Sequence, residues 1–116
     1  MDFPFQLVNE KYQSPGQNLN KMELFVPMGD FDVEVLKQFC LSKKTRARFD
    51  DFYFMVLFDK AENAAFPQTP FTAAYADEEL RKYIKAFYTF NSINGYSKLH
   101  VYEKNSLESI PEEFEI

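Results

Sequence analysis

Seven consecutive apolar or aromatic residues, Phe52–Phe58, constrain the fold of this chain more than any other stretch. Acidic residues bracket the run, Asp50 and Asp51 before it and Asp59 after it. A short run of aromatic and β-branched residues without alternation is typical of a strand buried on both faces, because a half-exposed strand would alternate polar and apolar side chains. We therefore expect residues 52–58 to form the central strand of a sheet.

The size and composition of the chain indicate one folded unit. It has 116 residues, of which 46% are hydrophobic and 18% aromatic, far from the composition of a disordered protein. We predict a single globular domain over residues 21–104. An N-terminal arm or edge strand over residues 1–20 precedes it, and an acidic, extended tail over residues 105–116 follows it.

The net charge of −5 comes mainly from the tail, because residues 105–116 alone sum to −4. A neutral body argues against nucleic-acid binding, which usually needs a basic face to displace counterions from phosphates. The basic cluster over residues 43–48 is predicted to be a solvated helix end. A second hypothesis is that the acidic tail, residues 108–115, docks on this cluster in the same chain or in a neighbouring copy.

Cysteine use and hydropathy say little about the compartment. With Cys40 as its only cysteine the chain can form no internal disulfide, and no run approaches the roughly 18 apolar residues of a membrane helix. The start of the chain lacks the basic and apolar regions of a signal peptide. We expect a soluble chain, cytoplasmic by default, and leave open a signal or lipid anchor upstream of Met1.

The first half of the chain predicts a βαβ unit. Residues 21–28 alternate at period two and predict a strand, after which Asp30 is a candidate N-cap. Residues 31–44 combine helical spacing with acidic residues at the start and basic residues at the end, which complements the helix dipole. If the two strands share one sheet, they run parallel.

The second half begins with the irregular segment over residues 59–76, in which a short strand over residues 71–75 is an alternative. From Asp77 the apolar spacing favours an amphipathic helix that ends near Gly95. The other interpretation makes residues 88–93 a strand entering a hairpin, with Phe90 facing Leu99. A last strand follows in either case.

Together these elements predict an α+β fold, a two-layer α/β sandwich with element order βαβ(β)αβ and a mixed sheet around the central strand. With the additional strand over residues 71–75, the order matches a ferredoxin-like arrangement. This is an analogy of element order, and it implies no function.

Catalytic and metal-binding patterns find little support. A seven-residue strand spans roughly 23 Å, so Asp50 and Asp51 cannot join Asp59 in one three-acid site. The single histidine, His100, lacks the partners that a general base or a metal site requires, and Cys40 sits on an apolar stripe where burial is expected. We predict no cofactor, no metal and no catalytic residues, so enzymatic activity is disfavoured.

The loop over residues 59–76 is the leading candidate for function. Phe66, Phe71 and Tyr75 lie among prolines and could form a rigid apolar surface for an unknown partner protein or small ligand. The leading hypothesis is a small non-catalytic binding domain. Its surface would be extended by those aromatic side chains that lie on the face the core leaves free, among Tyr88, Phe90, Tyr96 and Tyr102. One alternative is a small-ligand-binding protein or enzyme with a pocket beside Asp59 and Lys60, and another is a structural subunit of a homo-oligomer.

Overall fold

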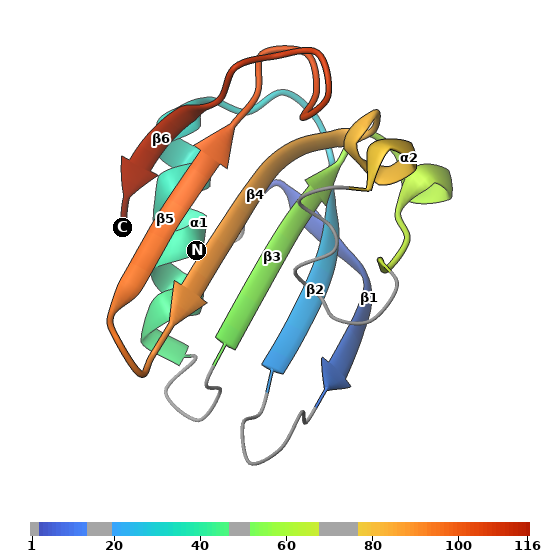
Figure 1. Cartoon of the computed structure of the whole chain (residues 1–116). Coiled ribbons are helices and arrows are strands. Elements are labelled where there is room, and N and C mark those ends of the chain that lie inside the picture. Colours follow the sequence, from blue (N-terminus) through green and yellow to red (C-terminus); the bar gives the residue numbers. More distant parts are fainter. Residues whose placement is uncertain (1–2, 14–19, 47–51, 68–76) are drawn as a thin grey trace.

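The computed structural model describes residues 3–13, 20–46, 52–67 and 77–116. In this part of the chain six strands form one mixed sheet in the order β1-β2-β3-β4-β5-β6, and one long helix, α1, crosses one face (Figure 1). The α+β class and the two-layer arrangement are therefore confirmed. The strands are β1 (Phe5–Gln13), β2 (Asn20–Pro27), β3 (Phe52–Phe58), β4 (Ile84–Asn91), β5 (Tyr96–Val101) and β6 (Glu112–Glu115); the helices are α1 (Val33–Arg46), the one-turn α2 (Glu78–Arg81) and the 3-10 turn η1 (Ala61–Asn63).

Strand β3 lies inside the sheet, as the apolar run predicts. It pairs parallel with β2 and antiparallel with β4, and six of its seven residues are buried. Its odd-numbered side chains join the core between the sheet and α1, whereas Phe54, Val56 and Phe58 join a second core on the opposite face. A strand that serves two cores has no polar face, which explains why its sequence does not alternate.

The βαβ unit forms as expected, with β2 and β3 parallel and joined through α1. The helix begins two residues later than predicted, and its N-cap is Asp32 instead of Asp30. The Asp32 Oδ1 atom accepts a hydrogen bond from the Val35 amide at 2.8 Å. Asp32 is the better cap because its carboxylate reaches an N–H group of the first helical turn.

The strand order differs from a ferredoxin-like sheet. That arrangement splits the βαβ unit with an intervening strand, whereas here β2 and β3 are hydrogen-bonded neighbours. The segment over residues 71–75, predicted as an alternative strand, lies outside the described residues. The sheet continues instead with the antiparallel strands β4, β5 and β6.

The long helix predicted after Asp77 is wrong. Asp77 does cap a helix, since its Oδ1 atom accepts from the amides of Glu79 and Leu80, but this helix, α2, ends at Arg81. The chain then continues as β4, whose side chains are buried on both faces of the sheet. A strand buried on both faces can place apolar residues at helical spacing, so periodicity alone does not separate the two states.

The alternative prediction, a strand that enters a hairpin, is correct, since β4 and β5 form an antiparallel hairpin. The predicted pairing of the two strands, however, is off by two residues. Phe90 pairs with Ser97 and not with Leu99. The turn has four residues, 92–95, and is closed by the Gly95 amide donating to the Asn91 carbonyl at 2.9 Å. Gly95 has φ +78°, so a left-handed glycine does occur here, in a hairpin turn and not at a helix end.

The tail contributes strand β6, which pairs antiparallel with β5. Lys44 Nζ donates to the main-chain oxygen of Ile116, just after β6, at 2.7 Å, and Lys37 Nζ lies 4.9 Å from the ring centroid of Phe114 within β6. Two lysines of α1 thus contact the tail, one at a main-chain oxygen and one at a ring. Arg48 and the side chain of Arg46, which belong to the predicted basic cluster, lie outside what the structure describes.

Candidate functional site on the sheet face opposite α1

Three rows of side chains cross the face of the sheet that lies opposite α1, at β3, β4 and β5. The strand registers align Phe52 with Asn91 and Tyr96, then Phe54 with Thr89 and Lys98, then Val56 with Phe87 and His100. Neighbouring strands lie about 4.8 Å apart, so each row is a continuous strip of surface or core. The face changes from apolar at β3 to polar at β5.

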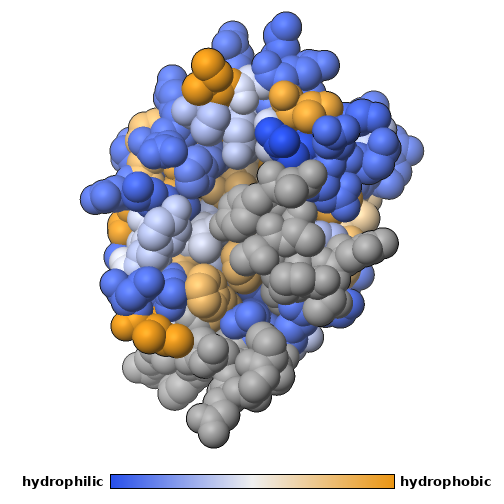
Figure 2. All heavy atoms as spheres, viewed as in Figure 1, coloured by the Kyte–Doolittle hydropathy of each residue, from blue (hydrophilic) through white to orange (hydrophobic). Residues whose placement is uncertain are grey.

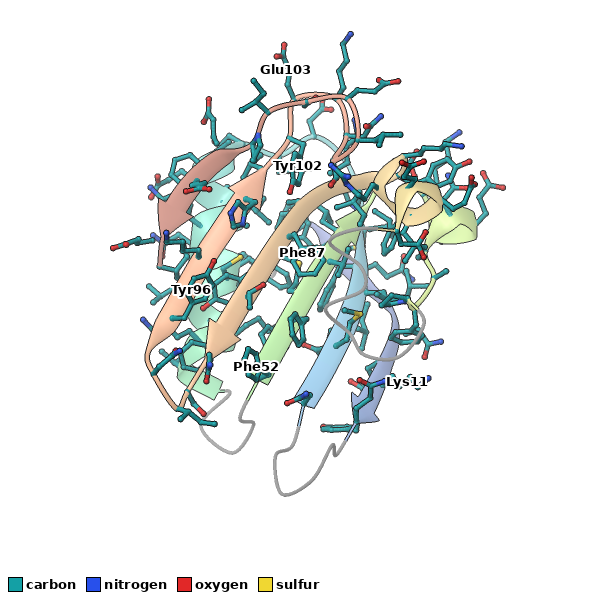
Figure 3. All side chains as sticks on the ribbon, in the orientation of Figure 1. Lys11, Phe52, Phe87, Tyr96, Tyr102 and Glu103 are labelled. Atoms are coloured by element: carbon teal, nitrogen blue, oxygen red, sulfur yellow. The ribbon has the colours of Figure 1, made fainter. Side chains whose placement is uncertain are left out.

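Partly exposed aromatic side chains surround the second core on this face, and we call this set the aromatic face. Tyr96 is 41% exposed, and the other members are half-buried. In Figure 3 the labelled members point from the strands toward the viewer, and Figure 2 shows apolar side chains among polar ones on the same side. The aromatic face consists of Phe52, Phe66, Tyr83, Tyr96 and Tyr102.

A lysine lies beside one of these rings, and a histidine follows it on the same face of β5. Lys98 Nζ lies 5.8 Å from the ring centroid of Tyr96. On the next row, His100 Nε2 lies 3.2 Å from Glu113 Oε1 on β6. Aromatic rings with polar and cationic neighbours are typical of protein interfaces, where tyrosine supplies apolar area and a hydroxyl together.

The structure places three of the five predicted site residues. Phe66 is half-buried against the second core, with Lys11 Nζ 5.9 Å from its ring centroid. Asp59 and Lys60 follow the C-terminal end of β3, as expected. Phe71 and Tyr75 lie outside the described residues, so the predicted loop surface is represented by Phe66.

Asp59 organises a turn. Its Oδ1 atom accepts hydrogen bonds from the Lys60 amide at 2.7 Å and from Asn63 Nδ2 at 3.0 Å, and its own amide donates to the Tyr83 carbonyl at 2.9 Å. These bonds hold the start of η1 against the residue before β4. The Oδ1 atom of the carboxylate is therefore engaged within its own turn.

The four tyrosine and phenylalanine candidates for an extended surface divide between the two faces. Tyr88 and Phe90 are buried in the core under α1, whereas Tyr96 and Tyr102 lie on the opposite face. Phe52 and Tyr83 were not predicted as surface residues, because one begins the apolar run and the other falls on the apolar stripe of the predicted helix. Only the strand pairing shows that both side chains lie on the face opposite α1.

A buried polar cluster lies on the other side of the sheet, under α1. Tyr53 Oη donates to Glu23 Oε1 at 2.5 Å, and Lys43 Nζ and Lys21 Nζ lie 3.5 Å and 3.7 Å from the oxygens of the same carboxylate. Glu23 is only 5% exposed and Tyr53 2%. A group this enclosed cannot meet a substrate without rearrangement, so we assign the cluster to folding. Alternation along residues 21–28 places Glu23 on the face of its strand opposite Met22 and Leu24.

A further group under α1, the Cys40 thiol, is closed to chemistry. Cys40 is fully buried, and burial raises the pKa of its thiol far above neutral pH, so it remains protonated and unreactive. Among the described residues, no three histidine, cysteine or acidic side chains come close enough together to hold a metal ion.

Comparison of the chain with protein-family models, with curated proteins and with solved structures found no match. In the described ranges, no helix is both long enough and apolar enough to cross a membrane. The site is therefore interpreted from its own geometry.

Alkaline pH should destabilise the fold through two buried tyrosines. Burial raises the pKa of Tyr53 well above 10.0 and that of Tyr88 to about 12. Their stabilising effect is complete below the unfolded value of 10.0 and is lost as the pH rises toward the folded values, because the unfolded state releases these protons first. Each tyrosine should contribute a slope of about 1.4 kcal/mol per pH unit above pH 10. Urea unfolding between pH 9 and 11.5 measures the slope, and Tyr88→Phe should reduce it; an unchanged slope in that variant would exclude Tyr88 as a source.

Proposed function

We propose that this chain is a small non-catalytic interaction domain that binds a partner protein through the aromatic face and the loop over residues 59–76. The observation that carries the proposal is the row of Phe52, Asn91 and Tyr96 across β3, β4 and β5. It sets two partly exposed rings on a rigid sheet, with Phe66 of the loop packed against the same core. Rigid aromatic side chains are the residues that most often dominate protein binding energy.

The surroundings of this row support a protein partner. Ile93, in the turn that joins β4 to β5 and leads into Tyr96, is 65% exposed. Lys98 adds a positive charge on the adjacent row, and His100 adds a polar ring on the row after it. An apolar and aromatic centre with polar side chains around it is the usual composition of a protein interface.

The alternative of a ligand or catalytic pocket beside Asp59 and Lys60 gains no support from the described residues. The Asp59 carboxylate serves its own turn, and Lys60 is exposed next to it. A pocket-based function would need convergent polar groups with free hydrogen-bonding capacity. The interaction domain is therefore the better-supported proposal.

The proposal is tested by affinity capture with matched double variants. Tyr96→Ala with Phe66→Ala removes two rings of the aromatic face, whereas Leu41→Ala with Ile110→Ala removes two exposed apolar side chains elsewhere, at 42% and 93% exposure. A partner bound by the unmodified chain should be retained at least about tenfold less by the first variant, as expected for interface aromatics, and equally by the second. Equal retention by both variants would contradict the proposal.

A further inference from the structure

Besides the aromatic face, the outer edge of β1 is a surface suited to binding, here through main-chain hydrogen bonds. Within the described ranges β2 is the strand neighbour of β1, which leaves its other side at the edge of the sheet (Figure 1). All seven residues from 6 to 12 are exposed. Alternate residues of an edge strand direct their N–H and C=O groups outward, and these groups form a template for another strand.

The two edges of the sheet are built differently. Strand β6 has four residues, and three of them are glutamates, so it is short and charged in the way that protects an edge from pairing. Strand β1 has nine residues, with Glu10 and Lys11 as its only charges. Its exposed side chains include Leu7 at 44%, Val8 at 37% and Tyr12 at 51%. The β1 edge is thus long, neutral and partly apolar.

A β-bulge divides this edge into two parts. The register shifts between Leu7 and Asn9, and residues 9–12 then pair regularly with β2. The regular part can extend the hydrogen-bond ladder, because outward groups repeat at every second residue. The bulged part presents Leu7 and Val8 as apolar contacts for whatever lies alongside.

A second copy of the chain fits this edge poorly. In an antiparallel pair of edge strands, a residue whose N–H and C=O groups point outward must lie opposite another such residue. When the two strands are identical and related by a two-fold axis, the axis must therefore pass beside one residue, which lies opposite its own copy. Centring on Glu10 or on Lys11 sets like charges opposite each other, which is destabilising. Centring on Leu7, Val8 or Asn9 puts both bulges inside the shared ladder, and centring on Tyr12 leaves only residues 11–13 of β1 to pair.

We propose that the outer edge of β1 binds an extended segment of another protein as an added strand, apolar in its centre and without net charge. The main-chain ladder supplies most of the attraction, and Leu7, Val8 and Tyr12 select apolar side chains opposite them. This contact is independent of the aromatic face, so either can exist without the other.

A defined peptide tests the inference. The probe is a fluorescent octapeptide with the sequence of β2, Asn-Lys-Met-Glu-Leu-Phe-Val-Pro, which is neutral and apolar in its centre. Within the fold this sequence pairs with the inner side of β1. The edge variant is Leu7→Lys with Val8→Lys, because lysine protects sheet edges. The matched control is Leu41→Lys with Ile110→Lys, which adds the same charge at exposed sites away from both the edge and the aromatic face. Circular dichroism checks that both variants fold.

Fluorescence anisotropy should show saturable binding to the unmodified chain, binding weakened by at least about tenfold in the edge variant, and no comparable loss in the control. A fully N-methylated peptide, which cannot donate to a ladder, should not bind. Equal binding to the edge variant, equal binding of the methylated peptide, or no binding to the unmodified chain would overturn the inference. So would sedimentation that shows a dimer abolished by the edge variant, because the edge would then belong to a second copy.

Discussion

Replacing Phe54 by alanine should lower the free energy of unfolding by about 4 kcal/mol, the typical loss for a fully buried aromatic side chain. Phe54 is 1% exposed at the middle of β3. Its ring stacks on Phe52 with centroids 5.6 Å apart and meets Phe87 edge-on at 6.2 Å. Because the strand is held in the sheet on both sides, the surrounding side chains cannot collapse fully into the space that the ring leaves.

Urea unfolding monitored by circular dichroism measures this loss. The matched control is Leu41→Ala, at a 42% exposed position of α1, which should change the free energy of unfolding by about 0.5 kcal/mol or less. If Phe54→Ala cost no more than Leu41→Ala, the second core would not be packed as described. The face opposite α1 would then lack the rigid base that the aromatic face requires.

Replacing Glu23 by alanine should cost about 3 kcal/mol, the scale expected when one partner of a buried charge cluster is removed. The substitution leaves Lys43, whose Nζ lies 3.5 Å from Glu23, and the Tyr53 hydroxyl without their acceptor. Both lysines of the cluster are 19% exposed, so solvent compensates only in part. The loss comes mainly from desolvated groups left unpaired.

Glu79→Ala is the matched control for this experiment. Glu79 pairs with Lys82 at 3.2 Å, but its side chain is 81% exposed, and exposed pairs of this kind contribute little to stability. Tyr53→Phe should cost less than Glu23→Ala, because it retains the ring and the two lysine contacts. Equal effects of Glu23→Ala and Glu79→Ala would show that the cluster under α1 does not stabilise the fold.

The central strand and the βαβ unit were predictable because their local signals agree with their tertiary setting. Residues 52–58 are apolar throughout because β3 contributes side chains to the cores on both faces of the sheet. The predicted helix, which corresponds to α1, carries acidic residues at its start and basic residues at its end. Only the cap was misplaced, at Asp30 instead of Asp32.

Strand β4 was not predictable from periodicity. Its apolar residues satisfy a helical spacing, and the strand forms because the free side of β3 needs a hydrogen-bonded neighbour. The four-residue turn at 92–95 then sets the register with β5. The register decides which tyrosines face outward, so the aromatic face could not be derived before it was known.

Part of the candidate site was nonetheless visible in the sequence. Phe66 was selected as a loop aromatic, and the structure packs it against the second core. Tyr96 and Tyr102 were candidates without an assigned face, and the strand register places both opposite α1. Glu23 was missed, because nothing local distinguishes a buried acidic residue from an exposed one on an alternating strand.

Site-specific photo-crosslinking tests most directly whether the aromatic face is the contact surface. A photoreactive phenylalanine derivative would replace Tyr96 in one variant and Leu41 in another, since both positions are similarly exposed, at 41% and 42%, on opposite sides of the sheet. In extracts of the source cells, the variant labelled at Tyr96 should form a discrete covalent adduct with a partner protein, and the variant labelled at Leu41 should not. An adduct from Leu41 with none from Tyr96 would contradict the proposed contact surface.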